Sequence, residues 1–454
     1  MRAYHVAVVG SGPSGFFAAA ALLRAAKESG EYQLRVDMLE MLPTPWGLVR
    51  SGVAPDHPKI KSISRQFEKF AADPGFRFFG NVTVGDQVSA ADLAQRYDAV
   101  IYAVGAQTDR PLGIPGEELP GSLAAVEFVG WYNAHPHFHD LAPDLSGARA
   151  VVVGNGNVAL DVARMLVSDC DELAATDVAD HALDALRGSG VQEVVIIGRR
   201  GPLQAPFTTL ELRELGEMAS MADVDVIVDP ADLAGITAED AAAAGHTVKL
   251  NIEVLRGFAE RPPAGRAKRI VFRFCTSPIE IRGQDRVSSI VLGRNELVAE
   301  NGRLVAKDTG TREELPAQLV VRAVGYRGEP TEGLPFDDRG GIIPNVEGRV
   351  DGSTNEYVVG WIKRGPSGVI GHNKKDSTEV ADLVLADLRD REPVSQAEDR
   401  AAQLADWLLS RQPALVTAEH WRTIDDHERG AGEPHGRPRV KLPTVPGLLA
   451  VGHG

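Results

Sequence analysis

The chain has 454 residues, of which 43% are hydrophobic and 24% charged, and its formal net charge is −15 at pH 7. A chain of this length forms two or three domains that each bury a hydrophobic core, and its acidic balance argues against general nucleic-acid binding. Cys170 and Cys275 lie too far apart for a disulfide framework, a zinc site or an iron–sulfur cluster, and no apolar run approaches the ~18 residues of a transmembrane helix.

The first predicted element is a strand, a glycine turn and a helix of the kind that binds a dinucleotide. An apolar run at 5–9 leads into Gly10, Gly12 and Gly15, spaced G-x-G-x-x-G, and small helix-forming residues follow. The first glycine allows a tight turn, the second lets the backbone approach phosphate, and the third lets helix pack on strand. Glu40, at the end of the next predicted strand, is placed to bind a ribose 2′-hydroxyl.

A proline- and glycine-rich stretch, 42–61, follows these elements, and loops of this length in compact domains usually serve a function. A helix is predicted at 61–72 and strands at 76–84 and 97–106. The last of these strands ends in Ala-Val-Gly and resembles the later segment 319–326.

The two similar strands bracket the middle of the chain, which we interpret as a domain inserted into an outer one. The first part of the outer domain is placed at 1–107, the inserted domain at 108–325 and the second part at 326–454. The end of this last part is expected to form a peripheral tail of helix and loop.

A second strand, glycine turn and helix lies inside the bracket, with Gly154, Gly156 and Ala159 spaced G-x-G-x-x-A. Arg199 and Arg200 follow the next strand, where an NAD-binding unit carries Asp or Glu. Guanidinium groups match a 2′-phosphate in charge and in bidentate geometry, so this dinucleotide is predicted to be NADPH. The alternative is a solvated pair of arginines at a strand end.

Two stretches of the inserted domain carry no catalytic motif. Residues 168–190 are polar and rich in Ala and Asp, which indicates an insertion or an extra helix. Residues 220–320 show mostly strand-like patterns, with a surface helix end at 239–245.

A third glycine-rich segment, 360–371, lies between a predicted strand and a helix predicted at 376–390. Backbone N–H groups at a helix start suit the electron-rich atoms of a flavin. Trp361 either contacts the flavin or packs as a core tryptophan after the strand. Because the second turn is assigned to NADPH, the first turn with Glu40 and this segment are predicted to bind FAD.

Five motifs together resemble adrenodoxin reductase and the adrenodoxin-reductase-type ferredoxin–NADP reductases of bacteria; they lie at 10–19, 45–58, 154–164, 198–201 and 360–371. The resemblance implies an α/β fold with two Rossmann-like three-layer domains, the NADPH domain being inserted in a discontinuous FAD domain. It also implies that NADPH passes a hydride to FAD and that reduced FAD gives single electrons to a ferredoxin.

The same resemblance implies which residues contact each cofactor. For FAD they are Ser14, Glu40, Leu48, Val84 and Trp361, with the backbone of Gly368, Val369 and Ile370. For NADPH they are Arg110, Asn155, Gly156, Asn157, Val158, Arg199, Arg200, Glu211 and Gly368.

His57 and Glu214 match positions proposed in the family to act near the nicotinamide or in proton handling. Each also has a plainer interpretation. A lone histidine is more often structural, and Glu211 and Glu214, three residues apart, share a helix face that is equally consistent with solvation. Ser14 stands where many relatives have Ala, and both residues are small.

The resemblance further implies an acidic ferredoxin as partner, a cytochrome P450 as one terminal acceptor, and a monomer. Because the chain itself is acidic, docking of that ferredoxin needs a local basic surface. We expect a cytoplasmic protein with no resident metal, no membrane association and no convincing signal peptide. The candidate docking cations are Lys59, Lys61, Arg65, Lys363, Arg364, Lys374 and Lys375.

The same motifs bear on other functions of proteins that bind two dinucleotides. A thioredoxin-reductase-like enzyme needs a redox Cys-x-x-C and a glutamate-synthase small subunit needs iron–sulfur cysteines, and the sequence has neither. A flavin monooxygenase-like enzyme and a non-catalytic sensor that binds FAD and NADPH are the remaining alternatives.

Overall fold

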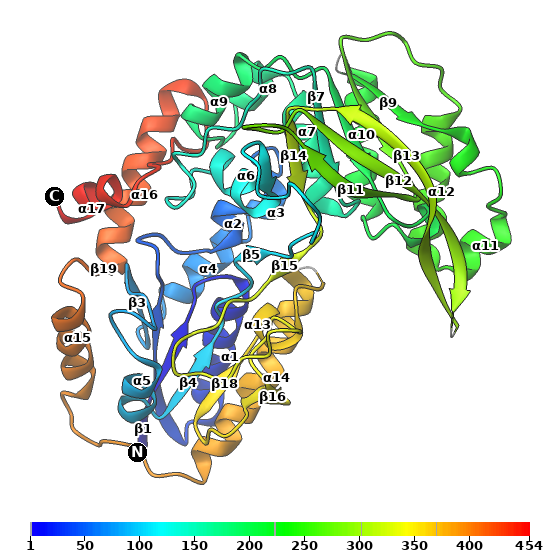
Figure 1. Ribbon diagram of the computed structural model, residues 1–454. Coiled ribbons are helices and arrows are strands. Elements are labelled where there is room, and N and C mark those ends of the chain that lie inside the picture. Colours follow the sequence, from blue (N-terminus) through cyan, green and yellow to red (C-terminus); the bar gives the residue numbers. More distant parts are fainter. Residues whose placement is uncertain (1, 222–223, 301, 369) are drawn as a thin grey trace. The chain divides into compact units, whose positions relative to one another are not determined.

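The computed structural model describes residues 2–221, 224–300, 302–368 and 370–454, and the chain forms two compact units (Figure 1). Unit 1 comprises Met1–Thr108, Asn133–His137 and Tyr326–Gly454, and unit 2 comprises Asp109–Tyr132 and Phe138–Gly325. The short strands β5 (Thr108–Asp109) and β15 (Tyr326–Arg327) pair with each other where the chain passes between the units.

Unit 1 is built on an eight-stranded sheet with the order β16-β17-β18-β4-β1-β2-β3-β19. The five central strands are parallel, and Val6 of β1 lies opposite Val36 of β2 and Ala99 of β4. The antiparallel strands are at the two edges. The strands are β1 (Arg2–Val9), β2 (Tyr32–Leu39), β3 (Phe76–Gly80), β4 (Ala99–Tyr102), β16 (Asn345–Val346), β17 (Arg349–Val350), β18 (Glu356–Val358) and β19 (Val416–Thr417).

The pairing of β4 with β18 joins the two parts of this unit. Strand β4 precedes the passage into unit 2 and β18 follows the return, yet Tyr357 lies opposite Ile101 in a parallel ladder. One sheet is therefore assembled from residues on both sides of the inserted segment.

Helices cover both faces of the unit 1 sheet because its strands bury both sets of alternating side chains. Val6 and Val8 belong to the core formed with α1, α4, α14 and α16, whereas Ala7 and Val9 belong to the core formed with α5 and α15. The helices are α1 (Pro13–Ser29), α2 (Leu48–Ser51), α3 (Pro58–Lys61), α4 (Ser64–Ala71), α5 (Ala90–Arg96), α13 (Trp361–Arg364), α14 (Ile370–Arg389), α15 (Arg400–Arg411), α16 (Ala418–Gly432) and α17 (Val445–His453).

Unit 2 contains a six-stranded parallel sheet with the order β6-β14-β7-β8-β10-β9. A three-stranded antiparallel sheet, β11-β12-β13, packs its apolar side chains on one face of this sheet. The strands are β6 (Ser122–Ala124), β7 (Arg149–Val153), β8 (Glu193–Ile197), β9 (Val224–Val228), β10 (Lys268–Arg273), β11 (Thr276–Arg282), β12 (Ser289–Glu300), β13 (Arg303–Pro316) and β14 (Leu319–Arg322).

The helices of unit 2 include α7, which contacts β7, β8 and β10, and α12, which contacts β9. The interpretation of 220–320 as mostly strand-like was wrong over α12, while the helix end expected at 239–245 coincides with α11 and 168–190 does contain extra helices. The helices are α6 (Ala125–Tyr132), α7 (Asn157–Val167), α8 (Cys170–Ala174), α9 (Asp180–Arg187), α10 (Thr209–Met221), α11 (Ala238–Ala243) and α12 (His246–Ala259).

Both units are thus layered α/β folds around a parallel sheet, and the predicted fold class is confirmed. Among the described residues, no helix is long and apolar enough to span a bilayer.

Candidate functional site

The first glycine turn of unit 1 connects β1 to α1, and each glycine has a separate steric reason. Gly10 has φ +102°, and a Cβ there would lie 2.5 Å from the carbonyl oxygen of Ala103. A Cβ on Gly15 would overlap the carbonyl oxygen of Gly10, so α1 reaches the turn only without one. Gly12, the N-cap of α1, has no atom within 4 Å of its Cβ position. The backbone at Gly12 therefore faces open space, as a phosphate cradle requires.

Glu40 lies at the end of β2 and its side chain is buried, with 7% of the residue exposed. Its Oε2 accepts hydrogen bonds from the backbone N (2.9 Å) and Oγ (2.5 Å) of Ser11, and its Oε1 accepts one from the backbone N of Leu42 (3.0 Å). Burial raises the pKa of Glu40 above its ordinary value, and these hydrogen bonds oppose that effect. Glu40 thus holds the glycine turn in place, and its contact with a ribose stays a prediction.

The proline- and glycine-rich stretch after Glu40 lies over the same turn. The backbone N of Trp46 donates to the carbonyl oxygen of Ser11 (3.1 Å), and a Cβ on Gly47 would lie 3.0 Å from the Cα of Gly12. Half-buried Leu48 then begins α2. The predicted FAD contacts Gly12 and Leu48 therefore belong to neighbouring segments of unit 1.

The third glycine-rich segment meets the turn from the other side. Gly360 has φ +74°, and a Cβ there would overlap the Oγ of Ser14. Its backbone N donates to the Asp376 carboxylate (2.6 Å), which also accepts a hydrogen bond from Lys363 (2.7 Å). The hydroxyl of Ser377 donates to the carbonyl oxygen of Ser14 (2.9 Å). Residues far apart in sequence are thus fixed around the start of α1.

Trp361 follows Gly360 and stacks on Tyr326 with ring centroids 5.5 Å apart. Its Nε1 is buried and has no hydrogen-bond partner in the part of the chain that the structure describes. A buried, unpartnered donor beside an open phosphate cradle fits a flavin, whose ring offers acceptors. Gly368 is exposed with φ +82° and Ile370 begins α14, whereas Val369 lies outside the described residues. Val84 is half-buried and forms a bridge with Val88.

The glycine turn of unit 2 repeats the geometry of the first. Gly154 has φ +122°, and a Cβ there would overlap the carbonyl oxygen of Ala323. Gly156 is the N-cap of α7, and its Cβ position is 3.8 Å from the nearest atom, in Pro206. The Asn157 side chain accepts a hydrogen bond from the backbone N of Thr208 (2.8 Å). The side chain of Asn155 lies against Gly198, and Val158 is half-buried.

Arg199 and Arg200 follow β8 and are both exposed. Neither guanidinium group makes a hydrogen bond or an ion pair with any residue that the structure describes. Their backbone is held instead: the carbonyl oxygen of Arg199 accepts from the Asn295 amide (2.9 Å), and that of Arg200 from the backbone N of Cys275 (3.0 Å). Arg199 and Arg200 thus have a fixed backbone and guanidinium groups without a protein partner among the described residues, an arrangement that suits a phosphate. Arg110 is also exposed.

Glu211 and Glu214, three residues apart on α10, face a buried cation on α7. Arg164, 3% exposed, lies 3.9 Å from the Glu211 carboxylate and 4.0 Å from that of Glu214. It also donates to Asp161 (2.8 Å). A fully solvated face is therefore wrong for Glu211, which is buried, while Glu214 is half-buried. Sequence reasoning did not select Arg164, although a charged residue on an apolar helix face is the signal that marks it.

His57 belongs to unit 1, where it is buried and serves as the N-cap of α3. Its carbonyl oxygen accepts hydrogen bonds from the backbone N of Ile60 (3.1 Å) and of Lys61 (3.2 Å). The residue therefore has a structural role at the start of this helix, and its role near a nicotinamide stays a prediction.

Comparison with known proteins gives the family. The profile described as "Pyridine nucleotide-disulphide oxidoreductase" matches residues 4–230. The chain is 67% identical over its full length to NADPH-ferredoxin reductase FprA of Mycobacterium tuberculosis, whose full length is also covered. The chain belongs to the adrenodoxin-reductase-type ferredoxin reductases.

A plant relative and a solved structure agree with this assignment. The mitochondrial NADPH:adrenodoxin oxidoreductase of Arabidopsis thaliana is 39% identical over 99% of this chain and 95% of its own length. The solved structure of Mycobacterium tuberculosis FprA in complex with NADPH matches with a TM-score of 0.97 over 100% of both chains. The resemblance inferred from the five motifs is confirmed.

Proposed function

We propose that this protein is an FAD-dependent ferredoxin–NADP(+) reductase, an enzyme that takes a hydride from NADPH and passes single electrons to a ferredoxin. One observation carries this function: two glycine turns of the same geometry stand in one chain, and the second is followed by two exposed arginines with free guanidinium groups. The full-length identity of 67% to an NADPH-ferredoxin reductase supports the same reaction.

In unit 2 the chain binds and orients the nicotinamide dinucleotide. Gly154 to Val158 surround the start of α7, whose free N–H groups and dipole attract the pyrophosphate. Arg199 and Arg200 hold the 2′-phosphate at the far end. Binding energy from this remote end places the reacting end, which needs no covalent nucleophile on the protein. Glu211 and Arg110 complete the proposed contacts.

In unit 1 the chain holds the flavin dinucleotide. The N–H groups around Gly12 suit its pyrophosphate, and Trp361 and the start of α14 would contact its ring. When held by these residues, FAD would supply the conversion of a hydride into single electrons that links a nicotinamide to a ferredoxin. His57 and Glu214 are proposed to hold or move protons, and Arg164 places the Glu214 carboxylate.

The partner is a ferredoxin, and we propose an acidic one that meets cations of unit 1. Lys59, Arg65 and Lys374 are exposed and make no ion pair with any described residue. The other candidates are already engaged: Lys61 donates to Asn133, Lys363 to Asp376 and Arg364 to Asn373, and Lys375 lies 3.8 Å from Glu379.

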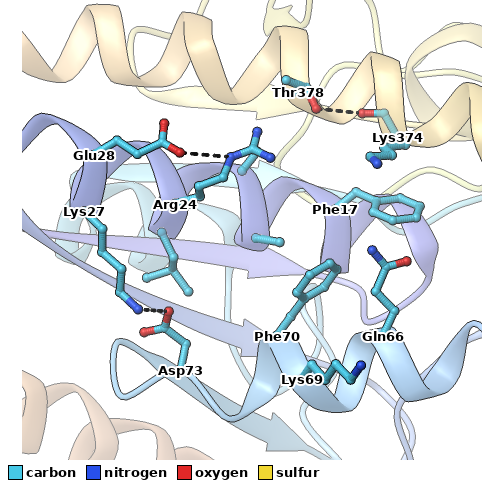
Figure 2. Close-up of a pocket in the computed structure, with 13 residues that line it drawn as sticks. Phe17, Arg24, Lys27, Glu28, Gln66, Lys69, Phe70, Asp73, Lys374 and Thr378 are labelled. Carbon is cyan, nitrogen blue, oxygen red and sulfur yellow. Dashed lines mark hydrogen bonds and ion pairs between the residues drawn. The ribbon is translucent and has the colours of Figure 1, made fainter.

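A cationic groove extends this surface. It lies between α1, α4 and α14, and Figure 2 shows Phe17 and Phe70 in it below the Lys374 side chain. Within it Lys27 pairs with Asp73 (2.6 Å) and Arg24 lies 4.0 Å from Glu28. Lys69 and Lys374 make no ion pair with the described residues. An acidic partner, a monomeric chain, a cytoplasmic location and a cytochrome P450 as final acceptor all belong to this proposal.

The experiment that tests the function measures bound flavin and electron transfer together. The purified protein should contain FAD and should reduce cytochrome c with NADPH only when a ferredoxin is added. Replacing Arg199 and Arg200 with Ala should lower kcat/KM for NADPH at least about 100-fold and leave the NADH value unchanged, because two charge-assisted contacts are lost. The exposed Arg187→Ala variant is the control. A protein with no flavin, or with equal NADH and NADPH rates, would overturn the proposal, and flavin without turnover would favour a sensor.

A further inference from the structure

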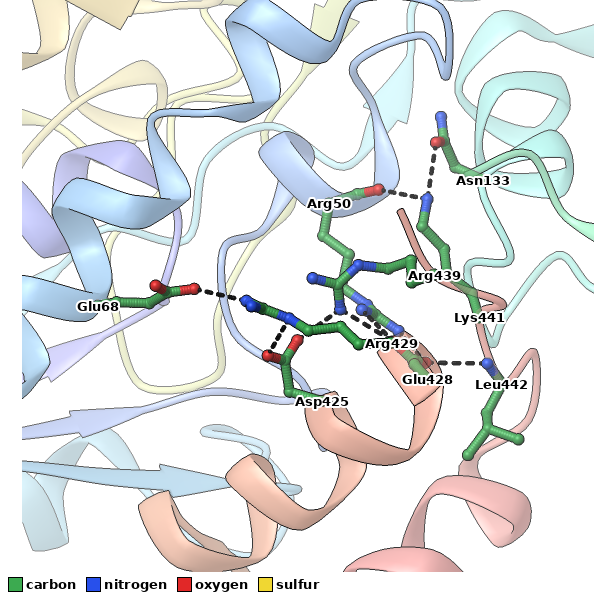
Figure 3. Close-up of polar contacts among 9 residues, drawn as sticks. All are labelled: Arg50, Glu68, Asn133, Asp425, Glu428, Arg429, Arg439, Lys441 and Leu442. Carbon is green, nitrogen blue, oxygen red and sulfur yellow. Dashed lines mark hydrogen bonds and ion pairs between the residues drawn. The ribbon is translucent and has the colours of Figure 1, made fainter. Parts of the chain in front are cut away.

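The C-terminal part of unit 1 is joined by buried charges to residues 42–61, which we call the FAD loop (Figure 3). Arg50, at the end of α2, donates from Nη1 (2.8 Å) and Nη2 (2.6 Å) to the two carboxylate oxygens of Glu428 on α16. The side chain of Glu428 is 0% exposed and that of Arg50 is 5% exposed. This bidentate ion pair therefore joins residues 378 positions apart in the sequence.

Residues after α16 complete the cluster. Arg439 donates to Asp425 (2.5 Å) and to Glu428 (3.2 Å). The buried ammonium group of Lys441 donates to the carbonyl oxygen of Arg50 (3.1 Å) and to the side chain of Asn133 (3.1 Å). We refer to Asp425, Glu428, Arg439 and Lys441 as the tail clamp, which thus holds both the side chain and the backbone of Arg50.

Aromatic contacts run alongside the charges. The ring of Trp421 on α16 meets the edge of Trp46 with centroids 5.1 Å apart. The guanidinium of Arg439 lies 5.4 Å from the centre of the Trp46 ring, and that of Arg50 lies 5.5 Å from the centre of Trp421. Two cation–π pairs and one T-shaped pair of tryptophans therefore join the tail to the loop.

Burying these charged groups costs desolvation free energy, so folding stability alone does not explain the network. Burial raises the pKa of Glu428, but the guanidinium groups of Arg50 and Arg439 outweigh burial and hold it below its ordinary value. Apolar side chains of the same volume are often at least as stabilising as a buried ion pair. What the charges add is a fixed geometry, since several directional hydrogen bonds converge on one carboxylate.

The geometry that is fixed belongs to the FAD cradle. The backbone N of Arg50 donates to the carbonyl oxygen of Gly47 (3.0 Å), one helical turn earlier. Gly47 packs on Gly12, and the neighbouring Trp46 donates to Ser11. One turn of α2 therefore links Glu428 to the glycine turn.

We propose that the tail clamp positions residues 46–50 over the first glycine turn, so that Glu428 and Arg439 are positioning residues for FAD. The inference rests on the proposed function, because it takes FAD as the molecule bound at that turn. The expectation of a merely peripheral tail was wrong, because Trp421, Ile424 and Leu448 belong to the core of unit 1.

The test compares Glu428→Gln and Arg439→Met with Arg400→Met in the holoenzyme. Arg400 is the matched control because it also joins the C-terminal part to the sheet through a buried pair, 2.8 Å to Asp98, with side chains 5% and 2% exposed. Asp98 binds β1 and the segment at Val394, away from the FAD loop. FAD release after dilution is followed by the rise in flavin fluorescence, and unfolding is followed separately by circular dichroism.

We expect both clamp variants to release FAD at least about tenfold faster than the parent and to change the visible circular dichroism of the bound flavin. Arg400→Met should lower the unfolding temperature without changing either flavin signal. Release within twofold of the parent in a folded clamp variant, or equal acceleration in Arg400→Met, overturns the proposal. If Arg439→Met does not fold, Arg439→Lys and Glu428→Gln decide in the same way. A parent protein that binds no FAD would instead refute the proposed function.

Discussion

His5 is a buried base in the middle of β1, with 5% of its surface exposed. Its backbone N donates to Asp98 (2.7 Å), and its Nδ1 has no hydrogen-bond partner among the described residues. Burial, followed by the charges of Arg400, Arg77 and Arg35, lowers the pKa of His5 from 6.5 to about 3. The folded protein therefore keeps this imidazole neutral at pH values at which the unfolded chain protonates it.

The sign of the pH effect follows from that difference. Between pH 6.5 and pH 3 the unfolded state binds a proton that the folded state does not, so stability falls as the pH falls. At pH 5 the loss amounts to about 2 kcal/mol relative to pH 8. We expect His5→Gln to remove this part of the loss, which is measured as the free energy of unfolding in urea at pH 8, 6 and 5. The exposed His427→Gln should retain the parent's pH dependence, and a parallel change in both variants would exclude His5 as the cause.

Single residues also mark the limit of sequence reasoning. Glu40 was predicted from its distance to the glycine motif, because motif and carboxylate lie on consecutive strands. Arg164, Asn295 and Glu428 were not selected, since each acts on a residue remote in sequence that only the fold brings near. A buried charged side chain needs an oppositely charged or hydrogen-bonding residue beside it, but the sequence alone does not identify that residue.

The glycines of the two turns differ in why glycine is needed: some are required by the backbone of the strand–turn–helix element, and others by the space left for a ligand. Gly10 and Gly154 have positive φ, and a Cβ at either would run into backbone. Gly12 and Gly156 have ordinary φ values of −73° and −93° and room for a methyl group. The first kind of glycine is required by the backbone conformation, and the second leaves open space that we propose a phosphate fills.

Alanine substitutions should separate these two demands. Gly12→Ala should leave the unfolding temperature of the flavin-free protein within about 2 °C of the parent and weaken FAD at least about tenfold, because its methyl group fills the phosphate cradle. Gly156→Ala should do the same for NADPH only. Gly10→Ala should instead lower the yield of folded protein, since strain and overlap combine. Titration by fluorescence quenching measures both affinities, and an unchanged FAD affinity in Gly12→Ala would contradict the assignment of this turn.

Element boundaries were harder to predict than element types. The helix predicted at 61–72 is α4, which begins only at Ser64 after the short α3, and the helix predicted from 376 begins at Ile370. Both differences occur where backbone turns near a glycine-rich or proline-rich segment set the helix start. The strand-like interpretation of 220–320 missed α12 because its apolar residues at 248, 250, 252 and 254 alternate with polar ones, as they do in a strand.

At the scale of the whole molecule, the two similar Ala-Val-Gly strands that bracket the inserted segment lie in different sheets. One strand, β4, lies in unit 1, whereas the other, β14, lies beside β7 in unit 2. Repeats in the sequence indicated two related sheets, and both were found. The C-terminal part was underestimated, because its role depends on contacts with the first 50 residues.

The charge of the whole molecule affects its encounter with a ferredoxin. A chain of net charge −15 repels an acidic ferredoxin overall, so productive encounters depend on local cations and on ionic strength. Reversing Lys59 and Arg65 to Glu should lower the ferredoxin-dependent rate of cytochrome c reduction about tenfold at low salt and flatten its salt dependence. Reduction of a small acceptor such as dichlorophenolindophenol should not change, because the flavin and NADPH sites are untouched.

Lys249→Glu with Arg303→Glu changes the net charge by the same amount at exposed positions of unit 2 and is the control. If docking depends on a local surface, only the Lys59 and Arg65 pair slows the ferredoxin reaction. Equal slowing by both pairs would mean that net charge alone governs encounter, and no slowing by either would place the ferredoxin elsewhere. The groove cations Lys69 and Lys374 are then the next pair to reverse, because they remain unpaired among the described residues of the same unit.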